Sequence, residues 1–108
     1  LGLLAQDIRW TNIGSTRFSG TFVGKQSVLE DLIGPLFRRL RNGIATEIED
    51  LVAEGEHVVA LSRGKAETVD GKPYNNRYCQ VMRLRNGRIA AVTEYMDTAL
   101  VDETFGRP

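Results

Sequence analysis

One acidic residue in the C-terminal half of the sequence has surroundings that favour acid–base chemistry. Residues 88–97 alternate in the manner of a β-strand, and Glu94 shares a face with Ala90, Val92 and Met96. A carboxylate on an apolar face has a raised pKa unless a nearby cation offsets the loss of hydration. Glu94 is therefore a candidate general acid or base.

Polar side chains also interrupt the predicted inner faces of other strands. Alternation places Trp10 and Asn12 on the inner face of an early strand. It places Tyr78 and Gln80 on the inner face of a later one, because Arg77 and Arg83 mark the other face of that strand as mostly solvent-exposed. Converging polar groups in a concave apolar cavity are typical of small-molecule sites. We predict that Glu94, Asn12 and Tyr78 carry the chemistry. The residues predicted to bind the substrate are Trp10, Leu61, Arg63, Asn76, Gln80 and Met96.

Each of these residues also has a purely structural interpretation. Arg63 and Glu94 are equally compatible with a buried ion pair. Asn12 and Asn76 could only satisfy backbone groups, which is the commoner role of buried amides. The two aromatic side chains of the set are compatible with ordinary core packing, their polar tips hydrogen-bonded. Pattern alone leaves these alternatives open.

Two other reactive side chains are expected to take no part. Cys79 falls on the outward face of its strand with no activating neighbour in sequence, and His57 follows a Glu-Gly-Glu turn, where a surface position is expected. The sequence has no catalytic triad pattern, glycine-rich phosphate loop or metal-ligand spacing. We therefore predict neither a metal nor a cofactor.

One helix and several strands must position the candidate residues. The apolar residues of 26–41 recur at helical spacing, and Gly34-Pro35 should kink or split that helix. Asp70-Gly71 and Asn86-Gly87 are strong hairpin signals. Strands are predicted at 7–13, 44–53, 57–68, 73–85 and 88–97, with a very short one at 22–23. These elements predict an α+β domain in which a curved antiparallel sheet wraps around a helix.

Composition narrows the class of protein. The 108 residues include 14 basic and 14 acidic side chains, and 42% are apolar, which predicts one globular domain spanning 1–108. No apolar run approaches the roughly 18 residues of a membrane span, and no basic stretch precedes an apolar one. The single cysteine excludes an internal disulfide framework, and the neutral charge balance disfavours nucleic acid as a partner. We expect a cytoplasmic protein whose partner is a small molecule, not a membrane.

Five segments, taken in order, resemble a known group of proteins. They are Asp7-Ile-Arg-Trp-Thr-Asn12, a Gly24 that opens a helix, Asp70-Gly-Lys-Pro-Tyr-Asn-Asn-Arg-Tyr78, Asn86-Gly-Arg-Ile89 and Glu94-Tyr-Met-Asp-Thr98. Together they resemble the SnoaL-like branch of the nuclear-transport-factor-like superfamily, which includes ketosteroid isomerase, limonene-1,2-epoxide hydrolase, scytalone dehydratase and the SnoaL polyketide cyclases. The resemblance covers essentially the whole chain. It implies a cone-shaped sheet around helices (a cystatin-like α+β roll), a deep pocket, and a homodimer formed through the outer face of the sheet.

The resemblance carries over only part of the relatives' catalytic machinery. The water-activating Tyr and Asn of the hydrolase fall on Trp10 and Asn12, and its final-strand Asp falls on Glu94. The hydrolase also has a catalytic triad made of this Asp, an Arg and a second Asp. The Arg and the second Asp fall on Leu61 and Arg63, so the triad is not present in this sequence. The general-base Asp of ketosteroid isomerase falls on Asn12, an amide that cannot abstract a proton. Glu94 also resembles, in its position, the acid–base Asp of the polyketide cyclases.

The resemblance therefore implies a cofactor-free acid–base enzyme acting on a small apolar substrate. Its reaction would be that of an isomerase, cyclase, dehydratase or hydrolase. A non-catalytic ligand-binding or dimerisation domain of the same fold is the alternative. Relatives begin with one or two helices, of which 1–5 would be only the end. We accordingly expect open core surface near Leu1, Leu3 and Leu4.

Overall fold

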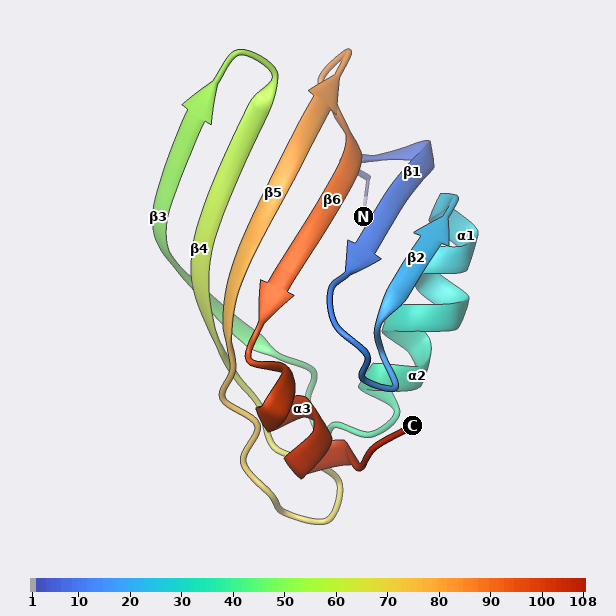
Figure 1. The fold of residues 1–108 in the computed structure, drawn as a ribbon, viewed down its shortest axis with the longest axis vertical. Coiled ribbons are helices and arrows are strands. Elements are labelled where there is room, and N and C mark those ends of the chain that lie inside the picture. The colour runs from blue at the N-terminus through green and yellow to red at the C-terminus, as the bar shows by residue number, and fades with distance from the viewer. Residues whose placement is uncertain (1) are drawn as a thin grey trace.

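A six-stranded mixed sheet forms most of the molecule (Figure 1). The computed structural model describes residues 2–108. The strands are β1 (Leu4–Asn12), β2 (Gly20–Val23), β3 (Ala45–Glu54), β4 (His57–Lys65), β5 (Arg77–Arg85) and β6 (Arg88–Met96). They lie in the order β2-β1-β6-β5-β4-β3, so the sheet has two free edges and is not a closed barrel. The α+β class predicted from the sequence is confirmed.

One helical segment packs against the β1 and β2 side of the sheet (Figure 1). It runs continuously through α1 (Lys25–Ser27), the wider π-helical turn η1 (Val28–Ile33) and α2 (Gly34–Phe37). The Gly34 amide donates to the carbonyl of Leu29, five residues earlier. Pro35 follows and has no N–H to donate, so the helix changes its hydrogen-bonding pattern at the predicted Gly34-Pro35 break.

A buried apolar cluster joins this helical segment to the sheet. Its fully enclosed members are Leu4, Ile8, Val28 and Val92. Ile8 and Val28 have no exposed surface at all, as the alternation of β1 and the periodicity of the helix require. The cluster fixes the helix over the sheet, and the space beside it becomes the cavity described below.

A C-terminal helix, α3 (Thr98–Phe105), was not predicted. The Asp97 side chain caps it by accepting the Leu100 amide at 3.2 Å, and Gly106 ends it at a positive φ of 85°. Both are ordinary start and stop signals that the sequence contains. Val101 and Phe105 pack α3 against Leu40 and Tyr74.

The N-terminal residues differ from the prediction of a helix tail. Leu4 and Ala5 begin β1 and are buried, because this strand lies beside β6 inside the sheet. Leu3 is 68% exposed, as expected, but the open surface expected near Leu4 is not found, because Leu4 is only 6% exposed. Leu1 lies outside the described residues.

The strand pairing also contains a feature that the hairpin signals could not predict. β1 runs parallel to β6, whereas all other neighbouring strands in residues 2–108 are antiparallel.

No helix in residues 2–108 is long and apolar enough to cross a membrane.

Candidate functional site

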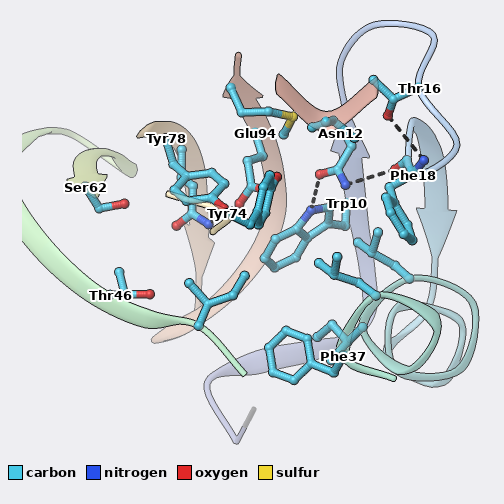
Figure 2. Close-up of a pocket in the computed structure, with 17 residues that line it drawn as sticks. Trp10, Asn12, Thr16, Phe18, Phe37, Thr46, Ser62, Tyr74, Tyr78 and Glu94 are labelled. Carbon is cyan, nitrogen blue, oxygen red and sulfur yellow. Dashed lines mark hydrogen bonds between the residues drawn. The ribbon is translucent and has the colours of Figure 1, made fainter. Parts of the chain in front are cut away.

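A cavity of about 220 Å³ lies between the inner face of the sheet, the helical segment and α3 (Figure 2). Apolar side chains dominate its wall, with a few polar groups among them. The lining residues are Trp10, Asn12, Thr16, Phe18, Leu32, Ile33, Leu36, Phe37, Ile44, Thr46, Ser62, Tyr74, Tyr78, Gln80, Glu94, Met96 and Val101. This composition is typical of a site for a small organic molecule.

Three polar residues form a transverse row on the cavity side of the sheet. Asn12 of β1 is the register partner of Glu94 in β6, and Glu94 is the partner of Gln80 in β5. Residues that pair directly across strands point to the same face. The strand alternation of three separate segments therefore brings an amide, a carboxyl and a second amide together.

Glu94 is largely buried, and its partner is uncharged. The Gln80 side chain donates Nε2–H to Glu94 Oε2. Burial raises the pKa of Glu94, and the hydrogen bond from Gln80 only partly opposes this. No Lys, Arg or His is among the described residues that line the cavity. Glu94 thus has the environment of a carboxyl that holds its proton to higher pH than an exposed glutamate does and can exchange it with a ligand.

Asn12 has a fixed orientation beside this carboxyl. Its Oδ1 accepts Trp10 Nε1–H at 2.9 Å, and its Nδ2 donates to the carbonyl of Phe18 at 3.0 Å (Figure 2). An amide nitrogen has two hydrogens, so these bonds leave one for a ligand. Trp10 therefore acts on the site through Asn12 as well as through its own ring.

Two tyrosines border Glu94 from the β5 side. Burial raises the pKa of both Tyr74 and Tyr78, so both phenols stay protonated at neutral pH. The Tyr78 ring crosses β4 closely at Gly64, where an added Cβ would lie 2.8 Å from Tyr78 Cε2 and from Ile44 Cγ2. Only glycine leaves the tyrosine ring room at this position.

Six predicted site residues line the cavity, namely Trp10, Asn12, Tyr78, Gln80, Glu94 and Met96. Their proposed roles remain predictions. Leu61 and Arg63 do not lie in the cavity: Leu61 is 41% exposed, and Arg63 forms ion pairs with Glu47 at 2.9 Å and Glu49 at 3.4 Å on the outer face. The expected pairing of Arg63 with Glu94 is therefore wrong.

The physical reason is the phase of the alternation in β4. Residues 58–61 are apolar on both faces of this strand, and the largest of them, Leu61, points outward. Small residues face the cavity because the Tyr78 ring occupies the space above them. One signal was available in the sequence: Arg63 shares its face of β4 with His57 and Lys65, polar side chains that indicate the solvent side.

Asn76 is also outside the cavity, although it is only 1% exposed. Its Nδ2 donates to Tyr74 Oη at 3.2 Å and to the Asp97 carbonyl at 3.1 Å, while its Oδ1 accepts the amides of Arg77 and Asp97. All of its polar atoms are engaged. The structural interpretation of a buried amide holds for this residue.

Several lining residues were missed by the sequence reasoning. Tyr74 lies in the loop before β5 and reaches the cavity because Asn76 holds its hydroxyl. Ser62 faces inward as the register partner of Tyr78, a relation that the correct β4 phase would have given. The helical residues Leu32, Ile33 and Leu36 belong to the apolar stripe already recognised, and this stripe forms the opposite wall.

Comparison with known proteins places this architecture in a family. Residues 1–92 match the SnoaL-like domain profile. The chain belongs to the SnoaL-like family. No curated protein matches it.

Solved structures agree with the SnoaL-like assignment at the level of the fold. An NTF2-like protein of unknown function from Burkholderia pseudomallei is 24% identical, with a TM-score of 0.84 over 95% of this chain and 79% of its own. A putative isomerase from Rhodopseudomonas palustris is 20% identical, with a TM-score of 0.80 over 98% and 81%. A protein with a ketosteroid isomerase-like fold from Catenulispora acidiphila, solved with trimethylamine, is 17% identical, with a TM-score of 0.80 over 99% and 79%.

Proposed function

We propose that this SnoaL-like chain is a cofactor-free acid–base enzyme that acts on a small, mostly apolar substrate. The observation that carries the proposal is Glu94, a carboxyl in an apolar cavity whose hydrogen-bond partner is the uncharged Gln80. A raised pKa brings a carboxyl closer to physiological pH, which suits it better to proton transfer. An isomerase or cyclase reaction fits this chemistry, and a dehydratase or hydrolase reaction uses the same groups.

In an isomerisation, the Glu94 carboxylate takes a proton from the carbon beside a carbonyl group. The C–H electron pair forms a new C=C bond, and the carbonyl oxygen gains the negative charge. The Tyr78 hydroxyl and the remaining Asn12 amide hydrogen are the donors that stabilise this oxygen. Glu94 then returns the proton to a different carbon, so the enzyme ends as it began.

Two observations on relatives support this proposal. One structural relative is described as a putative isomerase, and another binds trimethylamine, a molecule small enough for a cavity of this kind. The cavity of about 220 Å³ lies just below the range of about 300–1,000 Å³ typical of ligand pockets. The size therefore favours a compact substrate.

The test is turnover of a panel of cyclic ketones, lactones, epoxides and polyketide mimics. Glu94→Gln should lower turnover about 10²–10⁴-fold, because the amide keeps the shape but cannot exchange a proton. Glu56→Gln, the same change at an exposed hairpin turn, is the matched control and should leave turnover unchanged. Full activity of Glu94→Gln, with an intact fold by circular dichroism, would rule the mechanism out.

Ligand binding without chemistry is the second candidate function. The observation that favours it is the Gln80 bond, which occupies one of the two Glu94 oxygens. This candidate predicts saturable binding of a panel compound with no product after prolonged incubation. Formation of any product by the unaltered chain, but not by Glu94→Gln, would exclude it.

We also propose that the chain forms a homodimer through the outer face of the sheet. Leu61 and Tyr95 are 41% and 47% exposed there, and both are register partners of Cys79. Sedimentation at micromolar concentration tests this, and a monomer would contradict it. The cytoplasmic location expected from the sequence also stays a prediction, which cell fractionation would test.

A further inference from the structure

We propose that the cavity binds small hydrophobic ammonium compounds, tertiary or quaternary, with Glu94 as their counter-ion. This inference goes beyond the proposed function because it needs only the cavity and the carboxyl. It does not require turnover, so the two proposals can fail independently.

The first argument is the concentration of aromatic rings around one carboxyl. The chain has eight aromatic residues, and five of them, Trp10, Phe18, Phe37, Tyr74 and Tyr78, line this cavity. In Figure 2 the Glu94 side chain lies among the rings of Trp10, Tyr74 and Tyr78. The faces of aromatic rings carry partial negative charge and attract alkylammonium groups. Rings and carboxyl together therefore favour a cation over an anion.

The second argument is that the described side chains around Glu94 are uncharged. The titratable groups facing Glu94 from the neighbouring elements are Tyr74 and Tyr78, whose raised pKa values keep them neutral. The other polar neighbours are amides and hydroxyls: Asn12, Gln80, Thr16, Thr46 and Ser62. Met96 and the aliphatic side chains of the helical segment and α3 complete the wall. Among the residues that the structure describes, none that lines the cavity gives an ionised Glu94 a cation, so a ligand would have to supply it.

The third argument is that an amine can enter without adding net charge. A neutral tertiary amine and a protonated Glu94 bring no net charge into the cavity. Transfer of the Glu94 proton to the amine nitrogen then creates an ion pair in place. A buried ion pair is favourable only when both charges have further partners. Gln80 supplies one for the carboxylate, and the aromatic rings supply one for the ammonium.

Trp10 makes the experiment direct. It is the chain's single tryptophan and lines the cavity, so its fluorescence reports occupancy. The probes are phenyltrimethylammonium, its uncharged isostere tert-butylbenzene, and benzoate as an anion. We expect the cation to bind about ten-fold more tightly than the isostere, a difference typical of a paired, partly desolvated cation–π contact. Benzoate should bind more weakly than either.

Glu94→Gln should remove the preference for the cation while binding tert-butylbenzene as the unaltered chain does. Glu56→Gln, at the β3–β4 turn, should keep the preference. Equal affinity of the unaltered chain for the cation and its isostere would overturn the inference, as would a preference that survives in Glu94→Gln. Turnover of a neutral substrate alongside either result would leave the proposed function standing.

The pH dependence gives an independent outcome. Affinity for the quaternary cation should rise with pH as Glu94 ionises and then level off. For the tertiary amine N,N-dimethylbenzylamine, affinity should rise in the same way and fall again once the amine loses its own proton. A quaternary cation whose affinity does not change between pH 4 and pH 9 would contradict the role of Glu94 as counter-ion.

Discussion

The two faces of the sheet differ in how their charged side chains are paired. On the outer face, Arg63 and Arg77 meet Glu47 and Glu49 in exposed ion pairs, with both arginine side chains more than half exposed. On the inner face, Glu94 is largely buried with an amide as its partner. Exposed ion pairs cost little to form and contribute little to stability. A largely buried carboxyl with no cationic side chain beside it in residues 2–108 is costly, which supports the proposed role of Glu94 in binding or chemistry.

The largest effect on stability should come from crowding the inner face. Gly64→Ala would place a Cβ 2.8 Å from both Tyr78 and Ile44, so one of these side chains must move. We expect a loss of about 1–3 kcal/mol in the free energy of unfolding, measured by urea denaturation, together with weaker ligand binding. Gly2→Ala is the control, since a Cβ there meets nothing within 4 Å. Equal stability of the two variants would show that Tyr78 is not held against β4.

The second effect links Glu94 to stability as a function of pH. Its pKa is raised in the folded chain above the ordinary value of 4.5, so the folded state binds the proton more tightly than the unfolded state. Stability should therefore fall as pH rises from about 4.5 to the folded pKa and change no further above it. The stability difference between the unaltered chain and Glu94→Gln isolates this contribution. A difference that is constant from pH 4 to pH 9 would contradict the burial argument.

A smaller effect is expected from Gln80, which positions the carboxyl. Gln80→Leu removes the hydrogen bond that favours ionised Glu94, so the pKa of Glu94 should rise further. The pH profile of turnover or of ammonium binding should shift to higher pH, and Gln80→Asn should restore it in part. A merely structural role for Gln80 would lower activity without moving the profile.

The smallest effect should come from the outer face. Arg63→Ala removes exposed ion pairs with Glu47 and Glu49, so we expect no measurable change in thermal midpoint, turnover or ligand affinity. Thermal denaturation and the same activity assay provide the check. A marked loss of activity would mean that the outer face takes part in the function and would undo the comparison between the faces.

The sequence correctly predicts which side chains point into the cavity where charged or apolar residues clearly distinguish the two faces of a strand. Charges on one face of β5 placed Tyr78 and Gln80 inward, and the apolar face of β6 did the same for Glu94. β4 lacks such a contrast among its apolar residues, so the large side chain of Leu61 was wrongly expected inside. The contact between Gly64 and the Tyr78 ring fixes which face of β4 points toward the cavity, and this contact depends on tertiary packing.

Other parts of the fold were beyond local patterns. The pairing of β1 with β6 depends on segments from opposite ends of the chain, and no turn signal encodes it. The helix α3 is different, because Asp97 and Gly106 mark its ends within ten residues of each other. Both caps are local signals, so α3 is predictable from the sequence.

The parallel pairing of β1 with β6 has a consequence for the order of folding. The meander β3–β4–β5–β6 and the β1–β2 hairpin can each form from nearby segments, but Asn12 reaches Glu94 only when the two units dock. Contacts between distant segments form slowly because a long loop must close first. During synthesis on the ribosome, β1 must wait for β6 to emerge. The cavity should therefore be among the last features to mature, and refolding followed by Trp10 fluorescence should lag behind refolding followed by β-sheet circular dichroism.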